Sequence, residues 1–311
     1  MSKIIITGGA GFIGSHLADK LVNEGEQVVI IDNLYSGRLS YINPKAKFYL
    51  ADIREDIIDK IFEIEKPDIV YHLAAQMSVP FSVENPIFDM DVNIKGLLNL
   101  LQCSVKHQIK KFVFSSSGGA IYGETDDYPT TEMTQPEPFS PYAIAKYTSE
   151  HYLSFYKKQH GLDYVVLRFA NVYGPRQVSA HESGVVTIFV QNVLQGKPVK
   201  IYSYPHQSGG MYRDYVFVAD VVSALSKSRS YAGTDIFNVG TGKPTSTLEL
   251  FEYIKELSGK SVEHSFGPPR QGDLTRNCLN IDKSKSVLGW EPQYDIKKGL
   301  ESTLEYFRNL K

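Results

Sequence analysis

Short runs of β-branched and other apolar residues recur through the first half of the chain, and segments of helical length separate them. These runs predict buried strands over Ile4–Thr7, Val28–Ile31, Phe48–Ala51, Ile69–His72, Phe112–Ser115 and Val165–Arg168. Between them, apolar residues at helical spacing predict helices over Gly14–Asn23, Glu55–Glu65, Asp91–His107 and Tyr142–His160. Apolar strands that alternate with helices are typical of a parallel sheet covered on both faces, so we expect a doubly wound α/β fold.

The pattern loosens after Gly174-Pro175-Arg176, and Pro, Gly and Ser are frequent between residues 196 and 210. Helical spacing returns near 217–228, 246–258 and 296–310. We therefore expect a larger domain over 1–175, to which the chain returns around 213–240, and a smaller α/β lobe over 176–311. Parallel sheets bind ligands outside the carboxyl ends of their strands, so we expect the smaller lobe to close a cleft there.

Composition narrows the class of protein. The 311 residues are 42% hydrophobic and 22% charged, which is typical of a soluble globular protein. A net charge of -2 without a long basic run argues against nucleic acid as a partner. The longest apolar runs have the length of a strand and no secretion signal is visible, so we expect no membrane partner and a cytoplasmic protein. Cys103 and Cys278 have no metal-type spacing, so we expect neither a metal site nor a disulfide framework.

A glycine-rich segment, Thr7-Gly8-Gly9-Ala10-Gly11-Phe12-Ile13-Gly14, follows the first predicted strand and opens the first predicted helix. Glycines at positions 8, 11 and 14 permit a tight turn, a close approach of the backbone to a pyrophosphate, and close packing of helix on strand. The amide groups and the positive dipole end at the start of the helix favour phosphate. The segment therefore predicts a dinucleotide site.

Acidic residues end the next two predicted strands. Asp32 lies about 20 residues past the glycine turn, where a ribose diol is expected in such sites. Its carboxylate would accept hydrogen bonds from both ribose hydroxyls and repel a 2'-phosphate, so we expect NAD rather than NADP, although Arg38 is nearby. Asp52-Ile53 is placed to face the adenine, and Asp52 has a second interpretation as an ordinary helix N-cap before Glu55.

The reactive group is predicted from Tyr142 and Lys146, which are four residues apart and lie on one face of a predicted helix. A tyrosine is a poor base at neutral pH, but an adjacent ammonium and a positive nicotinamide would favour its phenolate. Two other pairs have the same spacing, Tyr41/Lys45 and Tyr294/Lys298. Only Tyr142 follows shortly after a strand that ends in Ser115-Ser116-Ser117, within the nucleotide-binding half.

These elements together resemble the extended short-chain dehydrogenase/reductase family, and within it the nucleotide-sugar 4-epimerases. The matching elements are the glycine loop, Asp32-Asn33, Asp52-Ile53, Leu73-Ala74-Ala75, Asn93, the serine run and the Tyr142/Lys146 pair. The resemblance implies a Rossmann-type NAD-binding domain over 1–175 and a nucleotide-sugar-binding lobe over 176–311. It implies that NAD contacts Gly8, Gly11, Phe12, Ile13, Gly14, Asp32, Asn33, Ser36, Gly37, Asp52, Ile53, Leu73, Ala74, Ala75, Gln76, Asn93, Ser115, Tyr142, Lys146 and Ala170.

The resemblance also assigns catalytic roles. It implies that Tyr142 is the general base, that Lys146 holds the ribose and tunes Tyr142, and that a serine hydroxyl binds the 4-oxygen of the sugar. We expect Ser117 in that role, with Ser116 as the alternative. Four residues separate Ser117 from Tyr122-Gly123, where many relatives have three.

Later motifs match the part of the family that contacts the nucleotide sugar. The stretch 167–176 contains Asn171, and the elements 212–216 and 270–273 contain two arginines suited to a diphosphate. The expected substrate contacts are Ser117, Tyr142, Asn171, Arg213, Arg270, Asp273 and Asn277. Asn277, or Cys278 beside it, falls where some relatives have a bulky aromatic, and a smaller residue there leaves room for a 2-acetamido group.

The activity implied by the resemblance is NAD-dependent 4-epimerisation of a UDP-hexose through a transient 4-keto intermediate. UDP-glucose and UDP-galactose are the expected sugars, their N-acetyl forms are further candidates, and UDP-glucuronate is the alternative. We expect a homodimer formed by the helices near 91–107 and 142–160.

Other enzyme classes fit the sequence less well. A 4,6-dehydratase or decarboxylase is disfavoured because Gly118-Gly119 stands where dehydratases of the family place an acidic pair. Asp32 disfavours an NADPH-dependent reductase. The joint presence of Ser117, Tyr142 and Lys146 disfavours a non-catalytic NAD-binding regulator.

Overall fold

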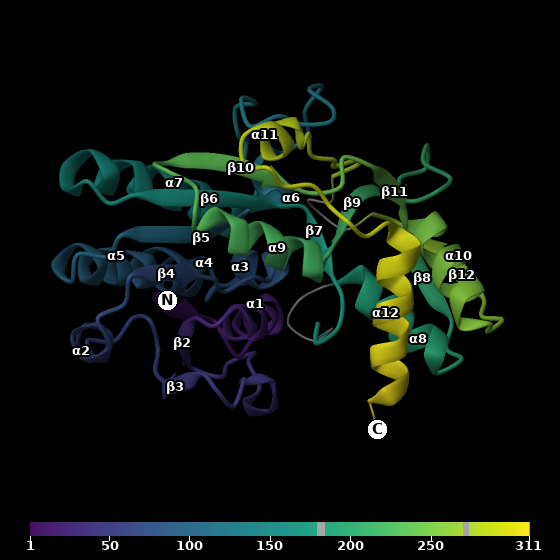
Figure 1. The fold of residues 1–311 in the computed structure, drawn as a ribbon. Coiled ribbons are helices and arrows are strands. Elements are labelled where there is room, and N and C mark those ends of the chain that lie inside the picture. The colour runs from purple at the N-terminus through teal and green to yellow at the C-terminus, as the bar shows by residue number, and fades with distance from the viewer. Residues whose placement is uncertain (179–183, 270–273, 311) are drawn as a thin grey trace.

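A seven-stranded parallel sheet forms the centre of the protein (Figure 1). The structure is a computed structural model that describes residues 1–178, 184–269 and 274–310. The strand order is β10-β6-β5-β4-β1-β2-β3. The strands are β1 (Lys3–Thr7), β2 (Gln27–Asp32), β3 (Lys47–Leu50), β4 (Ile69–His72), β5 (Lys111–Ser117), β6 (Tyr164–Phe169) and β10 (Asp235–Val239).

Helices cover both faces of the sheet, because alternate side chains of the same strands point to two separate hydrophobic clusters. Ile4 and Ile6 of β1 belong to a cluster with α1 (Phe12–Asn23) and α9 (Val218–Ser228). Ile5 belongs to the other cluster, with α2 (Ile57–Glu65), α5 (Gly96–Lys106) and α7 (Pro141–His160). The predicted doubly wound α/β fold is confirmed.

The helix predicted over 91–107 is wrong in its detail, since the segment is not one regular α-helix. The chain forms α3 (Val79–Glu84) and α4 (Pro86–Met90), then a π-helical turn η2 (Asp91–Lys95), and only then α5. The π-turn contains Asn93, whose side chain is buried and hydrogen-bonded to residues outside the helix. Such turns occur often at functional sites, and periodicity over 91–107 contains no signal for one.

The second half builds a smaller lobe beside one end of the large sheet (Figure 1). It has one sheet of order β11-β9-β7 and one of order β12-β8. Its strands are β7 (Asn171–Tyr173), β8 (Val199–Tyr202), β9 (Tyr212–Phe217), β11 (Pro244–Ser246) and β12 (His264–Gly267). The helices not yet named, from both parts of the protein, are α6 (Gly118–Ile121), α8 (Val185–Leu194), α10 (Thr247–Ser258), α11 (Asp282–Ser286), α12 (Ile296–Asn309) and the short 3-10 turn η1 (Leu39–Tyr41).

After β9 the chain crosses back to the large unit, where α9 packs against α1 and β10 pairs with β6. Within the described ranges, no helix combines the length and the apolar character needed to span a bilayer. The order of strands reverses beside β1, whose neighbours are β2 and β4. That point of reversal is where sheets of this kind bind ligands at the carboxyl ends of their strands.

Candidate functional site

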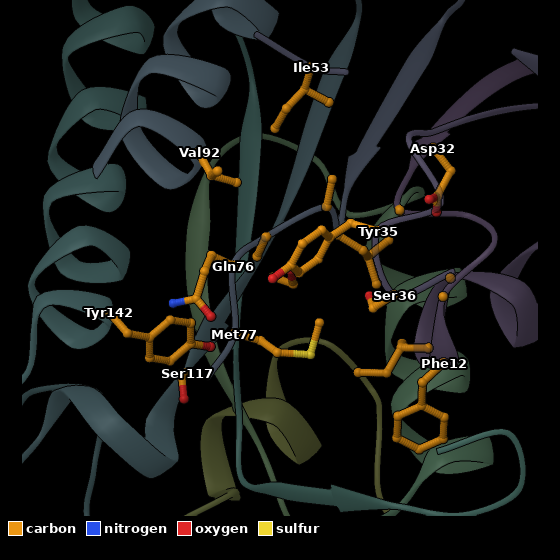
Figure 2. A pocket seen from close by; sticks show the side chains of 18 of the residues that line it. Phe12, Asp32, Tyr35, Ser36, Ile53, Gln76, Met77, Val92, Ser117 and Tyr142 are labelled. Atoms are coloured by element: carbon orange, nitrogen blue, oxygen red, sulfur yellow. The ribbon is translucent and has the colours of Figure 1, made fainter. Parts of the chain in front are cut away.

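A cavity of about 520 Å³ lies at this point of reversal, and almost all the predicted cofactor residues line it (Figure 2). The predicted residues in its wall are Gly8, Gly11, Phe12, Ile13, Gly14, Asp32, Asn33, Ser36, Asp52, Ile53, Leu73, Ala74, Ala75, Gln76, Ser115, Ser117, Tyr142, Lys146 and Ala170. In Figure 2, Asp32 and Phe12 lie on one side and Tyr142 with Ser117 on the other, so the cavity joins the predicted cofactor motif to the predicted reactive group.

The glycine turn has the close backbone packing that its sequence predicts. Gly8 has a φ of +71°, and a Cβ added there would come within 2.7 Å of the backbone nitrogen of Ala74. A Cβ at Gly14 would come within 2.1 Å of the Gly8 carbonyl oxygen. Helix α1 begins after Gly11, which offers no side-chain cap, so the first amides of the helix are available to an anion at the cavity wall.

Asp32 ends β2 at the rim of the cavity. Its carboxylate accepts hydrogen bonds from the backbone nitrogens of Ala10 (2.9 Å) and Leu34 (2.8 Å). Burial raises the pKa of Asp32, and these two amides act in the opposite direction. Gly37 lies behind this carboxylate rather than in the cavity wall, since a Cβ there would come within 2.8 Å of Asp32 Oδ1. An oriented acceptor beside the glycine turn fits the diol of a dinucleotide ribose.

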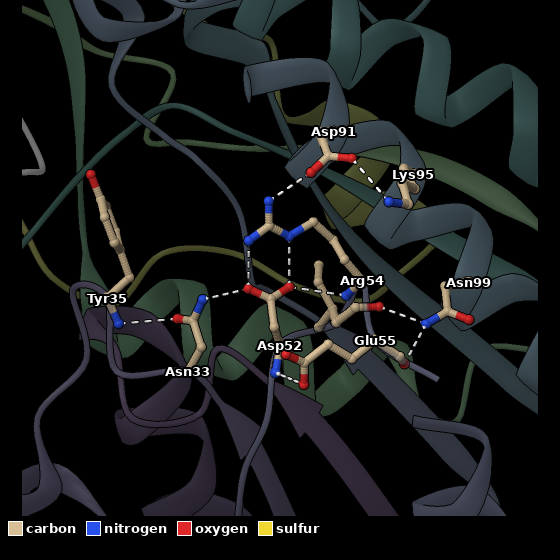
Figure 3. A network of polar contacts seen from close by, with 9 residues as sticks. Asn33, Tyr35, Asp52, Arg54, Glu55, Asp91, Lys95 and Asn99 are labelled. Carbon is tan, nitrogen blue, oxygen red and sulfur yellow. Dashed lines mark hydrogen bonds and ion pairs between the residues drawn. The ribbon is translucent and has the colours of Figure 1, made fainter. Parts of the chain in front are cut away.

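The adenine end that the sequence predicts contains a charged network (Figure 3). Arg54 binds Asp52 through two nitrogens, each at 2.8 Å, and binds Asp91 of η2 at 2.6 Å. The Arg54 guanidinium holds the pKa of Asp52 at about 2. The alternative interpretation of Asp52 as a helix N-cap is wrong, because α2 begins only at Ile57 with Asp56 at the capping position.

Asn93 is buried beneath the cavity and does not line it. Its amide accepts a hydrogen bond from the backbone nitrogen of Gln76 (3.0 Å) and donates one to the Gln76 carbonyl (2.9 Å). Asp89 of α4 accepts hydrogen bonds from both side chains, from Gln76 at 2.7 Å and from Asn93 at 3.0 Å. Asn93 therefore holds the segment that follows β4, which forms the cavity wall beside Tyr142.

Helix α7 places Tyr142 and Lys146. It begins on Ser140, which caps the Ala143 amide, and has Pro141 at its first position, two features that favour a helix start. Lys146 Nζ donates to the Ser115 carbonyl (2.9 Å) and lies 5.8 Å from the centre of the Tyr142 ring. Burial lowers the pKa of Lys146 to about 8.

The sequence predicts that nearby positive charge favours the phenolate of Tyr142, but the pKa of Tyr142 in the structure is shifted in the opposite direction. Burial raises its pKa to about 12, the hydroxyl of Ser117 acts to lower it, and the charge of Asp89 acts to raise it further. The cost of placing a phenolate in a buried position therefore outweighs the help that neighbouring side chains provide.

The three serines at the end of β5 have different partners. Ser115 donates to the His72 carbonyl (3.0 Å), and Ser116 donates to the buried carboxylate of Glu150 (2.6 Å). Ser117 is the serine whose hydroxyl contacts the Tyr142 phenol. This arrangement favours Ser117 over Ser116 as the hydroxyl that faces a substrate.

Among the predicted substrate residues that the structure describes, Asn171, Arg213 and Asn277 are not part of the cavity wall, and Asn171 and Asn277 converge on the turn after Ser117. Asn277 donates to the Gly118 carbonyl (3.2 Å), and a Cβ at Gly119 would come within 3.0 Å of Asn171 Oδ1. Arg213 of β9 donates to the carbonyl of its neighbour Tyr212 (2.9 Å). Arg270 and Asp273 lie outside the described residues.

Sequence reasoning missed several residues of the cavity wall. They are Ile31, Tyr35, Ala51, Arg54, Met77, Val79, Pro80, Phe88, Val92, Phe169, Val172 and Gln177, whereas Ser116, also in the wall, was the alternative to Ser117. Most are apolar, and they enter the wall from segments next to the recognised motifs. A useful signal was the position of Arg54, two residues after Asp52, from which a bidentate contact to that carboxylate is within reach.

The cavity thus combines a phosphate-binding turn, a ribose-type carboxylate and a Tyr–Lys pair at one edge of a doubly wound sheet. This is the constellation of a dinucleotide-dependent enzyme of the short-chain dehydrogenase/reductase type. Within that class the chain belongs to the NAD dependent epimerase/dehydratase family, whose model matches residues 4–240. The family resemblance and the cofactor NAD that the sequence predicts are confirmed.

Relatives match the chain over almost its whole length. UDP-glucose 4-epimerase of Mycolicibacterium smegmatis is 42% identical over 313 residues, which cover 99% of both chains. The structure of UDP-glucose 4-epimerase with UDP-glucose from Thermotoga maritima has a TM-score of 0.95 and 46% identity, and covers 98% of both chains. The enzyme of Thermus thermophilus in complex with NAD has a TM-score of 0.95 and 41% identity, and covers 99% of this chain and all of that one.

Proposed function

We propose that this chain is an isomerase that catalyses NAD-dependent 4-epimerisation of a UDP-hexose, with UDP-glucose and UDP-galactose as its two sugars. The observation that carries the proposal is the placement of Tyr142 and Ser117 in the wall of the same cavity as the glycine turn and Asp32. Full-length relatives that have this activity in their names support the choice of substrate.

The protein's own groups have separate tasks in this proposal. Bound NAD supplies the acceptor and donor of hydride at carbon 4 of the hexose. Tyr142 accepts the proton of the 4-hydroxyl and returns it after the sugar has turned over, so the net proton count is unchanged. Ser117 donates a hydrogen bond to the 4-oxygen, and Lys146 adds positive charge 5.8 Å from the Tyr142 ring centre.

We further propose that the smaller lobe holds the substrate by its nucleotide diphosphate, through Asn171, Arg213, Arg270 and Asp273. Both epimers must then face the same oxygen of Tyr142. This requires tight binding of the diphosphate and few directional contacts to the hexose. In this division of labour, residues 1–175 together with the returning segment near 213–240 bind NAD, and the rest of 176–311 binds the UDP-sugar.

The contacts of Glu124 support epimerisation over dehydration. A dehydratase needs an acid close to the catalytic hydroxyl, and Gly118-Gly119 follows Ser117 directly. Glu124 is the next carboxylate along the chain, but both of its oxygens accept hydrogen bonds from Thr275, one from the backbone nitrogen and one from the hydroxyl. Its carboxylate is therefore engaged in holding the segment around Thr275.

N-acetylated UDP-hexoses are the second candidate substrates, and Asn277 is the residue that bears on them. Its Nδ2 contacts the turn next to Ser117, and its Oδ1 is buried without a hydrogen-bond partner among the described atoms. Asn277 and Cys278 are both buried, and Asn277 is the better candidate for the pocket wall because its side chain reaches the Gly118 carbonyl next to Ser117.

The test is incubation with UDP-glucose, UDP-galactose, their N-acetyl forms and UDP-glucuronate, with the products separated and identified by NMR. A product inverted at carbon 4, formed without added NAD, is the expected result if NAD stays bound between turnovers. Ser117→Ala is the matched control and should lower the rate strongly. A dehydrated or decarboxylated product would overturn the proposal.

A homodimer through α5 and α7 belongs to the same proposal. Ile144 and Phe155 are about half exposed and stand eleven residues apart, which is close to three helical turns, so they share one face of α7. Tyr147 and His151 lie between them in ring contact at 4.6 Å. Ile144→Lys combined with Phe155→Asp should give a monomer in light scattering, whereas Val287→Asp, at an exposed residue directly after α11, should not. An unchanged mass would contradict this interface.

A further inference from the structure

A buried ion pair lies behind the reactive group and is not part of the cavity wall. Glu150 of α7 and Arg168 of β6 are each 4% exposed, and they meet through two contacts, Nη2 to Oε2 at 2.6 Å and Nε to Oε1 at 3.1 Å. Buried charges persist only where their geometry and remaining hydrogen bonds are well satisfied. The further partners of this pair therefore indicate what it holds in place.

The first further partner is the strand that carries the reactive serine. Ser116 Oγ donates to Glu150 Oε1 at 2.6 Å, one residue before Ser117. One residue earlier still, the Ser115 carbonyl accepts from Lys146 Nζ at 2.9 Å. The end of β5 is thus tied to α7 at two successive residues, immediately before the hydroxyl that contacts Tyr142.

The second observation is the spacing of Tyr142, Lys146 and Glu150 along α7. Glu150 comes four residues after Lys146 and eight after Tyr142, so the three lie along one side of α7. The charge of Glu150 acts to raise the pKa of Lys146 against the effect of burial. The other groups facing Lys146 are Asp89 of α4, which acts in the same direction, the imidazole of His72 on β4, and Tyr142 itself.

The far side of the ion pair leads away from the cavity. Arg168 Nη1 donates to the Tyr122 hydroxyl at 2.7 Å, and that hydroxyl donates to Asn238 Oδ1 of β10 at 2.9 Å. The network therefore has two arms. One runs through Ser116 to the reactive serine, and the other runs through Tyr122 into the sheet.

We propose that Glu150, held by Arg168, is a positioning residue for the reaction, which sets Ser117 against Tyr142 through Ser116 and adds to the counter-charge for Lys146 that Asp89 also provides. The inference rests on the proposed function, because its effects are read in the epimerase reaction. It predicts that the two arms of the network have different consequences when each is cut.

The test compares Ser116→Ala with Tyr122→Phe, each of which removes one hydroxyl and leaves the ion pair whole. We expect Ser116→Ala to lower kcat about tenfold with KM and NAD content nearly unchanged, and to lower Tm because a buried hydrogen bond to a charged group is lost. We expect Tyr122→Phe to lower Tm, since it leaves a buried guanidinium nitrogen unpaired, and to keep kcat within twofold of the wild type. Wild-type kcat in Ser116→Ala would overturn the positioning role.

A second variant tests the charge. Glu150→Gln combined with Arg168→Gln removes both charges, leaves neither unpaired, and keeps an acceptor for Ser116. The charge of Glu150 acts to raise the pKa of Lys146 and Arg168 is not among the groups that shift it, so Lys146 should then lose its proton at lower pH and the alkaline limb of the kcat profile should move to lower pH. An unmoved limb would overturn the counter-charge role.

Failure of the positioning role can be distinguished from failure of the proposed function. A wild-type enzyme that inverts none of the UDP-sugars refutes the proposed function, whatever the variants do. If the wild type is active and Ser116→Ala is as inactive as Ser117→Ala, then Ser116 binds the substrate directly and the positioning role is overturned.

Discussion

At the scale of single residues, the proposed chemistry depends on one phenol in the cavity wall. Replacing Tyr142 by Phe removes the proton acceptor and leaves the packing of the ring, so we expect kcat to fall by about 10²- to 10⁴-fold while NAD stays bound. Turnover and the NAD content of the purified protein are the two measurements. Tyr147→Phe is the matched control, since this hydroxyl of the same helix contacts Gln135 instead. Loss of NAD from Tyr142→Phe would show a different role.

A second residue-scale prediction concerns Asp89, whose Oδ2 is buried without a hydrogen-bond partner in the described structure. Its charge acts to raise the pKa of both Tyr142 and Lys146. Asp89→Asn keeps the acceptor that Gln76 and Asn93 use and removes the charge, so both pKa values should fall. The acid limb of the kcat/KM profile should therefore move to lower pH.

The control for this charge effect is Asp59→Asn. Asp59 is a carboxylate on α2 that binds Lys106 and His107. This variant should leave the pH profile in place. A limb that stays fixed in Asp89→Asn would mean that the residue carries no charge in the active protein.

At the scale of elements, the junction of β1, the glycine turn and α1 leaves no room for a side chain at Gly14. A Cβ there meets the Gly8 carbonyl oxygen at 2.1 Å and the Gly9 Cα at 2.9 Å, and backbone atoms cannot swing aside. We expect Gly14→Ala to destabilise the protein by about 3 kcal/mol and to weaken NAD binding. Thermal unfolding and NAD titration measure the two effects.

Gly209→Ala is the control for a glycine in ordinary contact, because its Cβ would lie 3.4 Å from Ser246. This variant should change neither the Tm nor the affinity for NAD by much. If Gly14→Ala binds NAD as well as the wild type, the close packing of α1 on the turn is not what the cofactor needs.

The elements that periodicity predicts well are those whose apolar faces point to a core. The strands β1, β2, β4, β5 and β6 were predicted to within about two residues at each end, because both their faces are buried. The π-turn at Asp91–Lys95 was not predicted, and the contact that its Asn93 makes with Gln76, 17 residues earlier in the chain, has no signal in the local sequence. The strand β10 was expected only as a return of the chain, because its place beside β6 depends on tertiary pairing.

The residues of the candidate site also fall into two groups, those that the sequence predicts and those that it does not. Residues with chemistry of their own, such as the glycine turn, Asp32 and Tyr142, are recognisable from type and spacing. Gln177 was missed because its role comes from Thr187 and the Val172 carbonyl, and the part of the Arg54 role that spacing from Asp52 does not indicate is its contact with Asp91. No local pattern in the sequence indicates such partners.

At the scale of the whole molecule, one segment joins the large sheet to the smaller lobe. Residues 275–280 exchange backbone hydrogen bonds with Thr130 on one side and with Tyr212 on the other. Asp214, a fully buried carboxylate of β9, accepts from the Leu279 nitrogen and from Thr241 as well. This segment fixes the lobe so that Asn277 reaches the turn after Ser117.

The last prediction concerns how the stability of the entire fold depends on pH. His72 is fully buried at the end of β4, where its Nδ1 contacts the Thr7 hydroxyl at 2.8 Å. Burial, helped by the charge of Lys146, lowers its pKa to about 3, against about 6.5 in an unfolded chain. Between these two values the unfolded state binds a proton that the folded state does not, so the free energy of unfolding falls as the pH is lowered from about 6.5 towards 3.

The effect of His72 on the free energy of unfolding is large enough to measure, and comparing a variant with the wild type separates it from the effects of other titrating groups. The slope approaches about 1.4 kcal/mol per pH unit inside the window and vanishes above it. His72→Asn should be less stable than the wild type at pH 7 but lose less on acidification, so the two curves converge. Buried carboxyls such as Asp214 have pKa values shifted upwards and act in the opposite sense, but they are common to both proteins and cancel in the difference.

Urea unfolding at a series of pH values, followed by the fluorescence of the buried Trp290, gives both curves. Thr7→Val supplies the control, because it removes the hydrogen-bond partner and keeps the imidazole buried. It should therefore lower the whole curve while keeping its slope. Parallel curves for His72→Asn and the wild type would mean that another group accounts for the loss of stability in acid.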